Sequence, residues 1–175
     1  MTWNSYHRRG EVLRSVIETA NVRRDGILPM DVNGVAQTFE DDVAVLAALE
    51  LRWHTRLAGQ IERNLMSQPM DLKSNVILAW QQTAVALPGV RAILDYYAAH
   101  PETAEMADNL AASTVKEHQL VAMMAGMASE IGDEETIQAG AELVERARTT
   151  PMPAIEPDDA EVLSFVARIR AAMVA

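Results

Sequence analysis

The chain has 175 residues, a net charge of −10 and no cysteine. This length suffices for one domain with a sizeable core, and the lack of cysteine excludes disulfides, thiol catalysis and cysteine-ligated metals. The negative charge disfavours binding to nucleic-acid phosphates, and no apolar run approaches the about 18 residues that cross a membrane. Because no signal peptide begins the sequence, we expect a cytoplasmic protein that binds neither nucleic acid nor membranes.

The first helix is predicted over residues 6–24, where apolar residues recur at helical spacing until Asp25 and Gly26 stop the pattern. Residues 1–24 are basic, with five arginines and two glutamates giving a local charge of +3. The simplest interpretation is a basic helix packed on an acidic bundle, and a patch for an anionic partner is the alternative. The apolar stripe of this helix is Leu13, Val16, Ile17 and Ala20.

A long second helix is predicted over residues 38–66. Thr38 followed by Asp41 is typical of a capping-box start. Core-facing positions then recur every three or four residues, and Glu50 occupies one of them, with His54 one turn later. The complete seam is Phe39, Val43, Leu46, Glu50, Trp53, Leu57 and Ile61.

Two shorter helical stretches are predicted between residues 71 and 99. Asp71 is the expected N-cap, and Pro88 with Gly89 is expected to break or kink the pattern. Pro101 is then expected at the first position of the next helix. The apolar residues that line these stretches are Leu72, Val76, Ala79, Thr83, Leu87, Ile93, Leu94 and Tyr97.

A second long helix is predicted over residues 102–131, with Gly132 as its end. Glu117 falls on its core-facing seam, inside a polar turn formed by residues 116–119. From residue 120 to 128 only Gly126 interrupts an apolar run that covers every face, which indicates a central position or a subunit contact. The seam is Met106, Leu110, Ser113, Glu117, Leu120, Met124, Met127 and Ile131.

The C-terminal part is predicted to contain two further helices. Asp133 and the two glutamates after it start a short helix that completes a bundle domain over residues 1–148. Prolines in residues 149–157 predict an extended connector, after which residues 158–175 form a helix that docks on the bundle or on a partner subunit. The apolar stripe of that last helix is Val162, Phe165, Val166, Ile169 and Met173. The predicted fold is an all-α bundle of five or six helices in which residues 38–66 and 102–131 run side by side.

The candidate site is a polar layer between the two long helices. Bundles that bind two metals combine inward glutamates with Glu-x-x-His motifs, and this sequence has no such motif. Three interpretations stay open: a divalent-metal or small-molecule site, a structural ion-pair network, or solvated glutamates. We expect a paired glutamate at position 50 and a polar cavity around position 117. The candidate ligands are Glu50, His54, Glu117 and His118, and the candidate cationic partners are Arg52, Arg56 and Lys116.

The predicted function follows from the lack of a motif with specific chemistry. The glycines are scattered singly, so no phosphate-binding loop is present, and no serine lies in a nucleophile elbow. We expect a non-enzymatic binding or interaction protein that forms a homodimer. The alternative is a metal- or small-molecule-binding bundle, an enzyme included, that uses the glutamate and histidine layer. No catalytic residue or cofactor is assigned.

Overall fold

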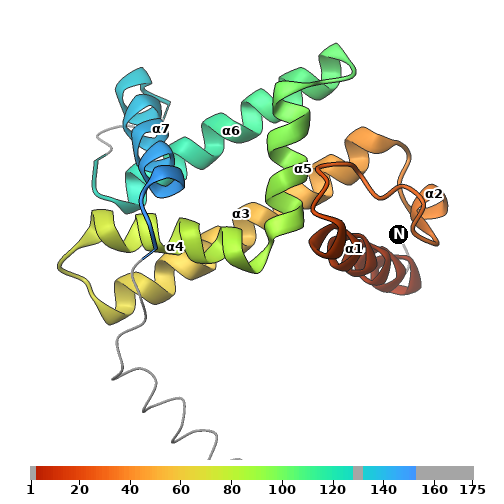
Figure 1. Cartoon of the computed structure of the whole chain (residues 1–175), viewed down its shortest axis with the longest axis horizontal. Helices are drawn as coiled ribbons and strands as arrows, with labels where there is room; N and C mark the ends of the chain where they lie inside the picture. Colours follow the sequence, from red (N-terminus) through yellow and green to blue (C-terminus); the bar gives the residue numbers. More distant parts are fainter. Residues whose placement is uncertain (1–2, 128–131, 153–175) are drawn as a thin grey trace, which may run out of the picture.

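The computed structural model describes residues 3–127 and 132–152, with side chains from residue 7 onward. These residues form helices joined by loops and turns, without a strand, and the all-α class is confirmed (Figure 1). None of the helices described is long and apolar enough to cross a membrane. The helices are α1 (Trp3–Arg23), α2 (Val35–Thr38), α3 (Asp42–Ser67), α4 (Leu72–Ala86), α5 (Pro88–Ala99), α6 (Ala104–Met124) and α7 (Glu134–Thr149).

The long helix α3 runs through the middle of the molecule, and the other helices are arranged around it (Figure 1). The helix α4 turns back along α3, whereas α5 packs on α1, and α6 packs most extensively on α7. The two long helices α3 and α6 contact each other. However, α3 packs more extensively on α4, and α6 packs more extensively on α7. The layer between α3 and α6 is therefore closed by α4, α5 and α7.

The start of α3 differs from the prediction. Thr38 is the last residue of the one-turn helix α2, and Asp41 is the N-cap of α3, accepting a hydrogen bond from the Ala44 amide at 2.8 Å. Phe39 between them is extended (φ −115°, ψ 141°), which buries its ring in the core. A continuous helix through Phe39 is excluded by this conformation, so the capping-box start at Thr38 is wrong.

The bounds of α6 also differ from the prediction. Thr103 is the N-cap, accepting from the Met106 amide at 3.1 Å, so Pro101 lies outside the helix. The helix ends at Met124 because Gly126 is left-handed (φ 68°), and the amides of Gly126 and Met127 bond back to the carbonyls of Met123 and Ala122. These two bonds form a Schellman motif, which terminates a helix. The predicted continuation to Gly132 includes residues 128–131, which lie outside the described residues.

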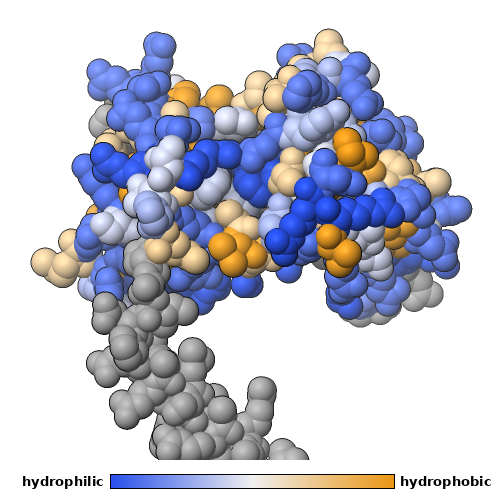
Figure 2. Space-filling model, in the orientation of Figure 1, coloured by the Kyte–Doolittle hydropathy of each residue, from blue (hydrophilic) through white to orange (hydrophobic). Residues whose placement is uncertain are grey.

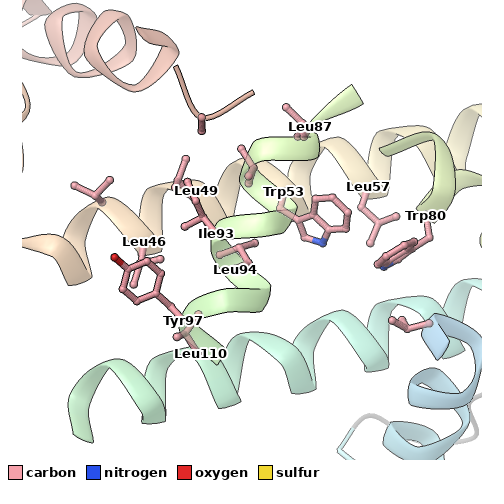
Figure 3. Close-up of a cluster of buried hydrophobic side chains, with 14 of the residues drawn as sticks. Leu46, Leu49, Trp53, Leu57, Trp80, Leu87, Ile93, Leu94, Tyr97 and Leu110 are labelled. Carbon is pink, nitrogen blue, oxygen red and sulfur yellow. The ribbon is translucent and has the colours of Figure 1, made fainter. Parts of the chain in front are cut away.

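The core is built from the inward side of every long helix (Figure 3). Trp53 and Leu57 of α3 are fully buried, and Ile93 of α5 and Leu110 of α6 belong to the same core cluster. Two glycines allow the closest contacts: a Cβ on Gly89 would lie 2.1 Å from the Ala20 carbonyl of α1, and a Cβ on Gly140 would lie 1.9 Å from the His118 carbonyl of α6. Glycine at these positions lets α5 approach α1 and lets α7 approach α6.

The C-terminal end of the described chain is anchored on α4. The helix α7 begins after its N-cap Asp133, as predicted, and its last turn receives the side chain of Gln81. The Gln81 amide donates to the carbonyls of Ala147 (3.1 Å) and Thr150 (2.7 Å), which are acceptors that a helix end leaves unpaired. The predicted helix over residues 158–175 and most of the predicted connector lie outside the described residues.

Candidate functional site

Glu117 of α6 lies at the centre of the candidate site. Its residue exposure is only 7%, as its seam position predicted. The indole N–H of Trp53 donates to Oε2 at 2.9 Å, and the indole N–H of Trp80 donates to Oε1 at 2.7 Å. The two rings meet edge to face with centroids 5.6 Å apart (Figure 3). A buried indole N–H requires an acceptor, so this one carboxylate satisfies the polar atoms of two core tryptophans.

Arg91 of α5 supplies the nearest positive charge. Its Nη1 lies 3.4 Å from Oε2 of Glu117, and its guanidinium lies 4.8 Å from the centroid of the Trp53 ring. The other terminal nitrogen of Arg91 contacts Asp95 at 2.9 Å. The guanidinium therefore neutralises the buried carboxylate and also stacks on one of the tryptophans that bind it.

Arg148 of α7 extends the network on the Trp80 side. It forms a two-point contact with Asp95, at 2.7 and 3.0 Å, and its guanidinium lies 5.0 Å from the Trp80 centroid. Although burial favours the neutral form of Asp95, the hydrogen bond and charge of Arg148 together with Arg91 lower the pKa of Asp95. The cluster thus joins five helices, α3 to α7, with two carboxylates and two guanidinium groups in balance.

Glu50 and His54 of α3 lie beside this cluster and are half-buried. Burial raises the pKa of Glu50, against the effects of the Ser113 hydroxyl and the charges of Lys116 and Arg91. The Oε1 atom of Glu50 is buried without a hydrogen-bond partner. Glu117 therefore has the paired contacts that we expected at Glu50, and the small cavity that we expected at Glu117 is lined by both glutamates.

His54 and His118 are both partly buried, and Glu117 affects the pKa of each. His54 Nε2 lies 4.0 Å from Oε2 of Glu117, and burial lowers the pKa of His54 while the Glu117 charge opposes that shift. Burial likewise lowers the pKa of His118, with Glu117 again opposing. The structure gives no contact between His118 and Glu50, and its backbone carbonyl faces Gly140 of α7. Both imidazoles are therefore favoured in the neutral form.

The cavity at Glu50 is small. Its volume is about 20 Å³, and its polar walls include Glu50, Arg91, Ser113 and Glu117. Arg91 Nε is a second buried polar atom there without a partner. A cavity of this size holds about one water molecule, and a water with Glu50 and Arg91 as neighbours matches both unpaired atoms.

A metal ion is not well matched by these donors. Across residues 3–127 and 132–152 no three histidine, aspartate or glutamate side chains are grouped so that they could hold one. The guanidinium of Arg91 lies where a cation would have to approach Glu117, and like charges repel. The role of Glu50, His54, Glu117 and His118 as ligands stays a prediction.

The sequence did not identify the main partners of Glu117. The expected cations Arg52, Arg56 and Lys116 are all exposed, and none of them contacts Glu117. The observed cation is Arg91, from a helix that was considered only for its apolar lining. Trp53 was predicted as a seam residue of the second helix. The indole nitrogens of Trp53 and Trp80, which must find an acceptor when buried, are the signal that could have linked both residues to a seam glutamate.

Comparison of the chain with protein-family models, with curated proteins and with solved structures finds no match. The function is therefore argued from the geometry.

Proposed function

We propose that this protein is a non-enzymatic interaction protein that acts as a homodimer, and that its Glu117 layer is structural. The observation that carries the proposal is the pairing of both Glu117 oxygens with indole N–H groups, at 2.9 and 2.7 Å. A carboxylate that acts as a base or ligand needs a lone pair directed at the substrate or metal. At Glu117 each oxygen already accepts from an indole of the core, and Oε2 also faces the guanidinium of Arg91.

The size of the cavity supports the same proposal. Pockets for small molecules commonly have volumes of about 300 to 1,000 Å³. The cavity beside Glu50 has about 20 Å³, so a substrate would have to separate α3 from α6 to enter. Such a separation would break the hydrogen bond from Trp53 of α3 to Glu117 of α6.

The alternative function is a metal- or small-molecule-binding bundle. One observation favours it: Glu50 Oε1 and Arg91 Nε are buried beside the cavity without partners. Buried polar atoms of this kind are uncommon and sometimes mark functional sites. The alternative requires the layer to open, and it would place the ligand at Glu50 and not at Glu117.

The support for a homodimer comes from apolar surface that the described residues leave uncovered. The apolar segment that suggested a subunit contact is mostly covered by the chain itself, since Val121, Ala122 and Ala125 are buried. Met123 stays 44% exposed, and large apolar side chains also lie exposed elsewhere, for example Val22 and Met70. On the face drawn in Figure 2 such residues are scattered among hydrophilic ones. The stronger support is the predicted apolar stripe of residues 158–175, which needs a surface to cover it.

We also propose a cytoplasmic location and no binding to nucleic acid. A cytoplasmic location is supported by the absence of cysteine, which suits a reducing compartment. Independence from nucleic acid is supported by the net charge of −10.

Two measurements test the proposal. Light scattering coupled to size exclusion should give twice the chain mass at micromolar concentration, and a single-chain mass up to high micromolar concentration would contradict the dimer. Elemental analysis of protein purified without added metal separates the alternative. A stoichiometric metal that is lost in Glu50→Gln and kept in the exposed control Glu62→Gln would favour the metal-binding function.

A further inference from the structure

A groove of about 390 Å³ lies between α1 and α3. Its floor includes Leu13 and Ile17, which are partly buried against the core, and its rim carries Arg14, Glu18 and Arg52, all exposed. Gly10 leaves part of the rim open, because it has no side chain and a Cβ built there would meet no atom within 4 Å. The groove thus combines an apolar floor with charged edges.

The two arginines of this groove have no ion-pair partner among the residues that the structure describes. In the part of the chain that the structure describes, neither Arg14 nor Arg52 has an ion pair or a side-chain hydrogen bond, whereas Arg23, Arg91 and Arg148 each contact an aspartate. The chain as a whole carries −10. An apolar floor flanked by free guanidinium groups matches an amphipathic helix with acidic residues at one end.

The sequence contains a segment of that chemistry. Residues 158–175 lie outside the described residues, and they begin with Asp158, Asp159 and Glu161. Apolar residues then follow at helical spacing, beginning with Val162 and Phe165. We infer that the groove between α1 and α3 is the docking site of residues 158–175 of this chain. The acidic residues lie opposite Arg14 and Arg52, and the apolar stripe covers Leu13 and Ile17.

The position where the described chain ends indicates whether residues 158–175 dock on their own copy or on the partner copy. Gln81 holds the Thr150 carbonyl against α4, so the chain leaves the bundle at the α4 and α7 side. Figure 1 places α7 and α1 at opposite ends of the molecule. This separation favours exchange of the segment between the two copies of the dimer proposed above, and the inference rests on that proposed function only for this choice of copy.

A second groove is the rival docking site. It has about 210 Å³ between α4 and α7 and is lined by Lys73, Met127, Leu143 and Arg146 among others. It is the smaller of the two, and Met127 directly precedes residues 128–131, whose placement is not described. Ala139 on its wall offers a position for a probe.

Cysteine cross-linking of the full chain tests the docking, because the natural chain has no cysteine to interfere. One variant carries Gly10→Cys, a second carries Ser164→Cys, and the two are mixed and treated with a short bis-maleimide. The matched controls replace Gly10→Cys by Met70→Cys, at a side chain that is 96% exposed, or by Ala139→Cys at the rival groove. The inference predicts that the Gly10 and Ser164 pair forms a covalent dimer at least about tenfold faster than either control.

The outcomes separate the docking site from the dimer. A cross-link within one chain, seen when both substitutions are in the same molecule and absent on mixing, supports the groove and contradicts the homodimer. A rate equal to that of the Met70 control, or a faster rate with Ala139→Cys, overturns the groove.

Charge exchange provides a second measurement. Arg14→Glu with Arg52→Glu should slow the cross-link about fivefold, as expected for two partly exposed ion pairs. Adding Asp158→Lys with Asp159→Lys in the partner should restore the rate. An unchanged rate in the first variant, or no restoration in the second, overturns the charge pairing and with it the proposed orientation.

Discussion

Trp80 donates its indole N–H to Oε1 of Glu117 at 2.7 Å, which joins α4 to α6 inside the core. The other oxygen of the same carboxylate accepts from Trp53 of α3. Loss of one side chain, that of Glu117, would therefore leave two buried indole donors without their acceptor and would remove one of the two carboxylates that Arg91 contacts. This asymmetry makes Glu117 the most informative position for mutation.

Glu117→Leu should lower the free energy of unfolding by about 3 to 5 kcal/mol, because it breaks a buried and paired charge. Glu117→Gln keeps one carbonyl acceptor and should lose about 1 to 3 kcal/mol. Urea denaturation followed by tryptophan fluorescence measures both, and the emission itself should change because Trp53 and Trp80 lose their partner. A loss below 1 kcal/mol for Glu117→Leu would contradict the structural role.

Glu50→Gln should raise stability at neutral pH by about 0.5 to 1 kcal/mol, a modest gain because the residue is only half-buried and water screens its charge. Burial raises the folded-state pKa of Glu50 above the unfolded value of 4.5, so ionisation disfavours the folded state at pH values above the folded pKa. The gain should shrink as the pH falls through the folded pKa towards 4.5. The exposed Glu62→Gln serves as the control and should stay within about 0.5 kcal/mol. A destabilised Glu50→Gln would mean that its carboxylate is needed.

His54 should make the protein less stable in mild acid. Burial lowers its folded-state pKa below 6.5, so its contribution is present above pH 6.5 and is lost as the pH falls through the folded pKa. The groups around it are Glu117, which opposes the shift, and Arg91 and Lys116, which support it. Chemical denaturation between about pH 5 and 7 should show that the free energy of unfolding depends less on pH in His54→Gln than in the natural chain. The comparison is best made in the Glu50→Gln background, because Glu50 also contributes to the pH dependence. His100→Gln is the matched substitution at an exposed histidine, and an equal effect of both substitutions would argue against a special environment at His54.

Gly140→Ala should destabilise the bundle by about 1 to 3 kcal/mol, because the added Cβ meets the His118 carbonyl and forces α7 away from α6. Gly89→Ala should act similarly on the contact between α5 and α1, where the neighbour is the backbone of Ala20. Gly10→Ala is the matched control, since its Cβ meets nothing within 4 Å and alanine favours a helix. Thermal melts should rank Gly10→Ala at or above the natural chain. Equal melting temperatures for all three variants would show that the helices can adjust freely.

The periodic pattern of the sequence predicted the helices well because burial repeats with the helical turn. It placed Glu117 inward, it identified Asp71 as an N-cap, and it placed the start of a helix at Asp133. Both aspartates accept a hydrogen bond from the first turn of their helix. The end of α6 could not be chosen in this way. Gly126 and Gly132 are both isolated glycines in the left-handed region, and only the bonds back to Ala122 and Met123 show that the first one terminates the helix.

The partners of Glu117 could not be predicted from the helical periodicity for a different reason, which is their distance along the chain. Arg91 lies 26 residues from Glu117, and Trp53 lies 64 residues from it. Such pairs depend on how the helices cross, and local spacing carries no information about crossing. The candidates taken from the sequence were cations on the same helix as one of the glutamates, Arg52 and Arg56 near Glu50 and Lys116 next to Glu117, and all three are exposed to solvent.

The shared carboxylate also constrains when the core can be completed during synthesis. The helices α3, α4 and α5 leave the ribosome before α6, and at that stage Trp53 and Trp80 have no Glu117 to accept their indole protons. Burying both rings without an acceptor is costly, so a nascent chain that ends before α6 is held back from closing around them. Only after residue 117 has emerged do both buried indoles have an acceptor. The guanidinium of Arg148, near the end of α7, then packs on the Trp80 ring.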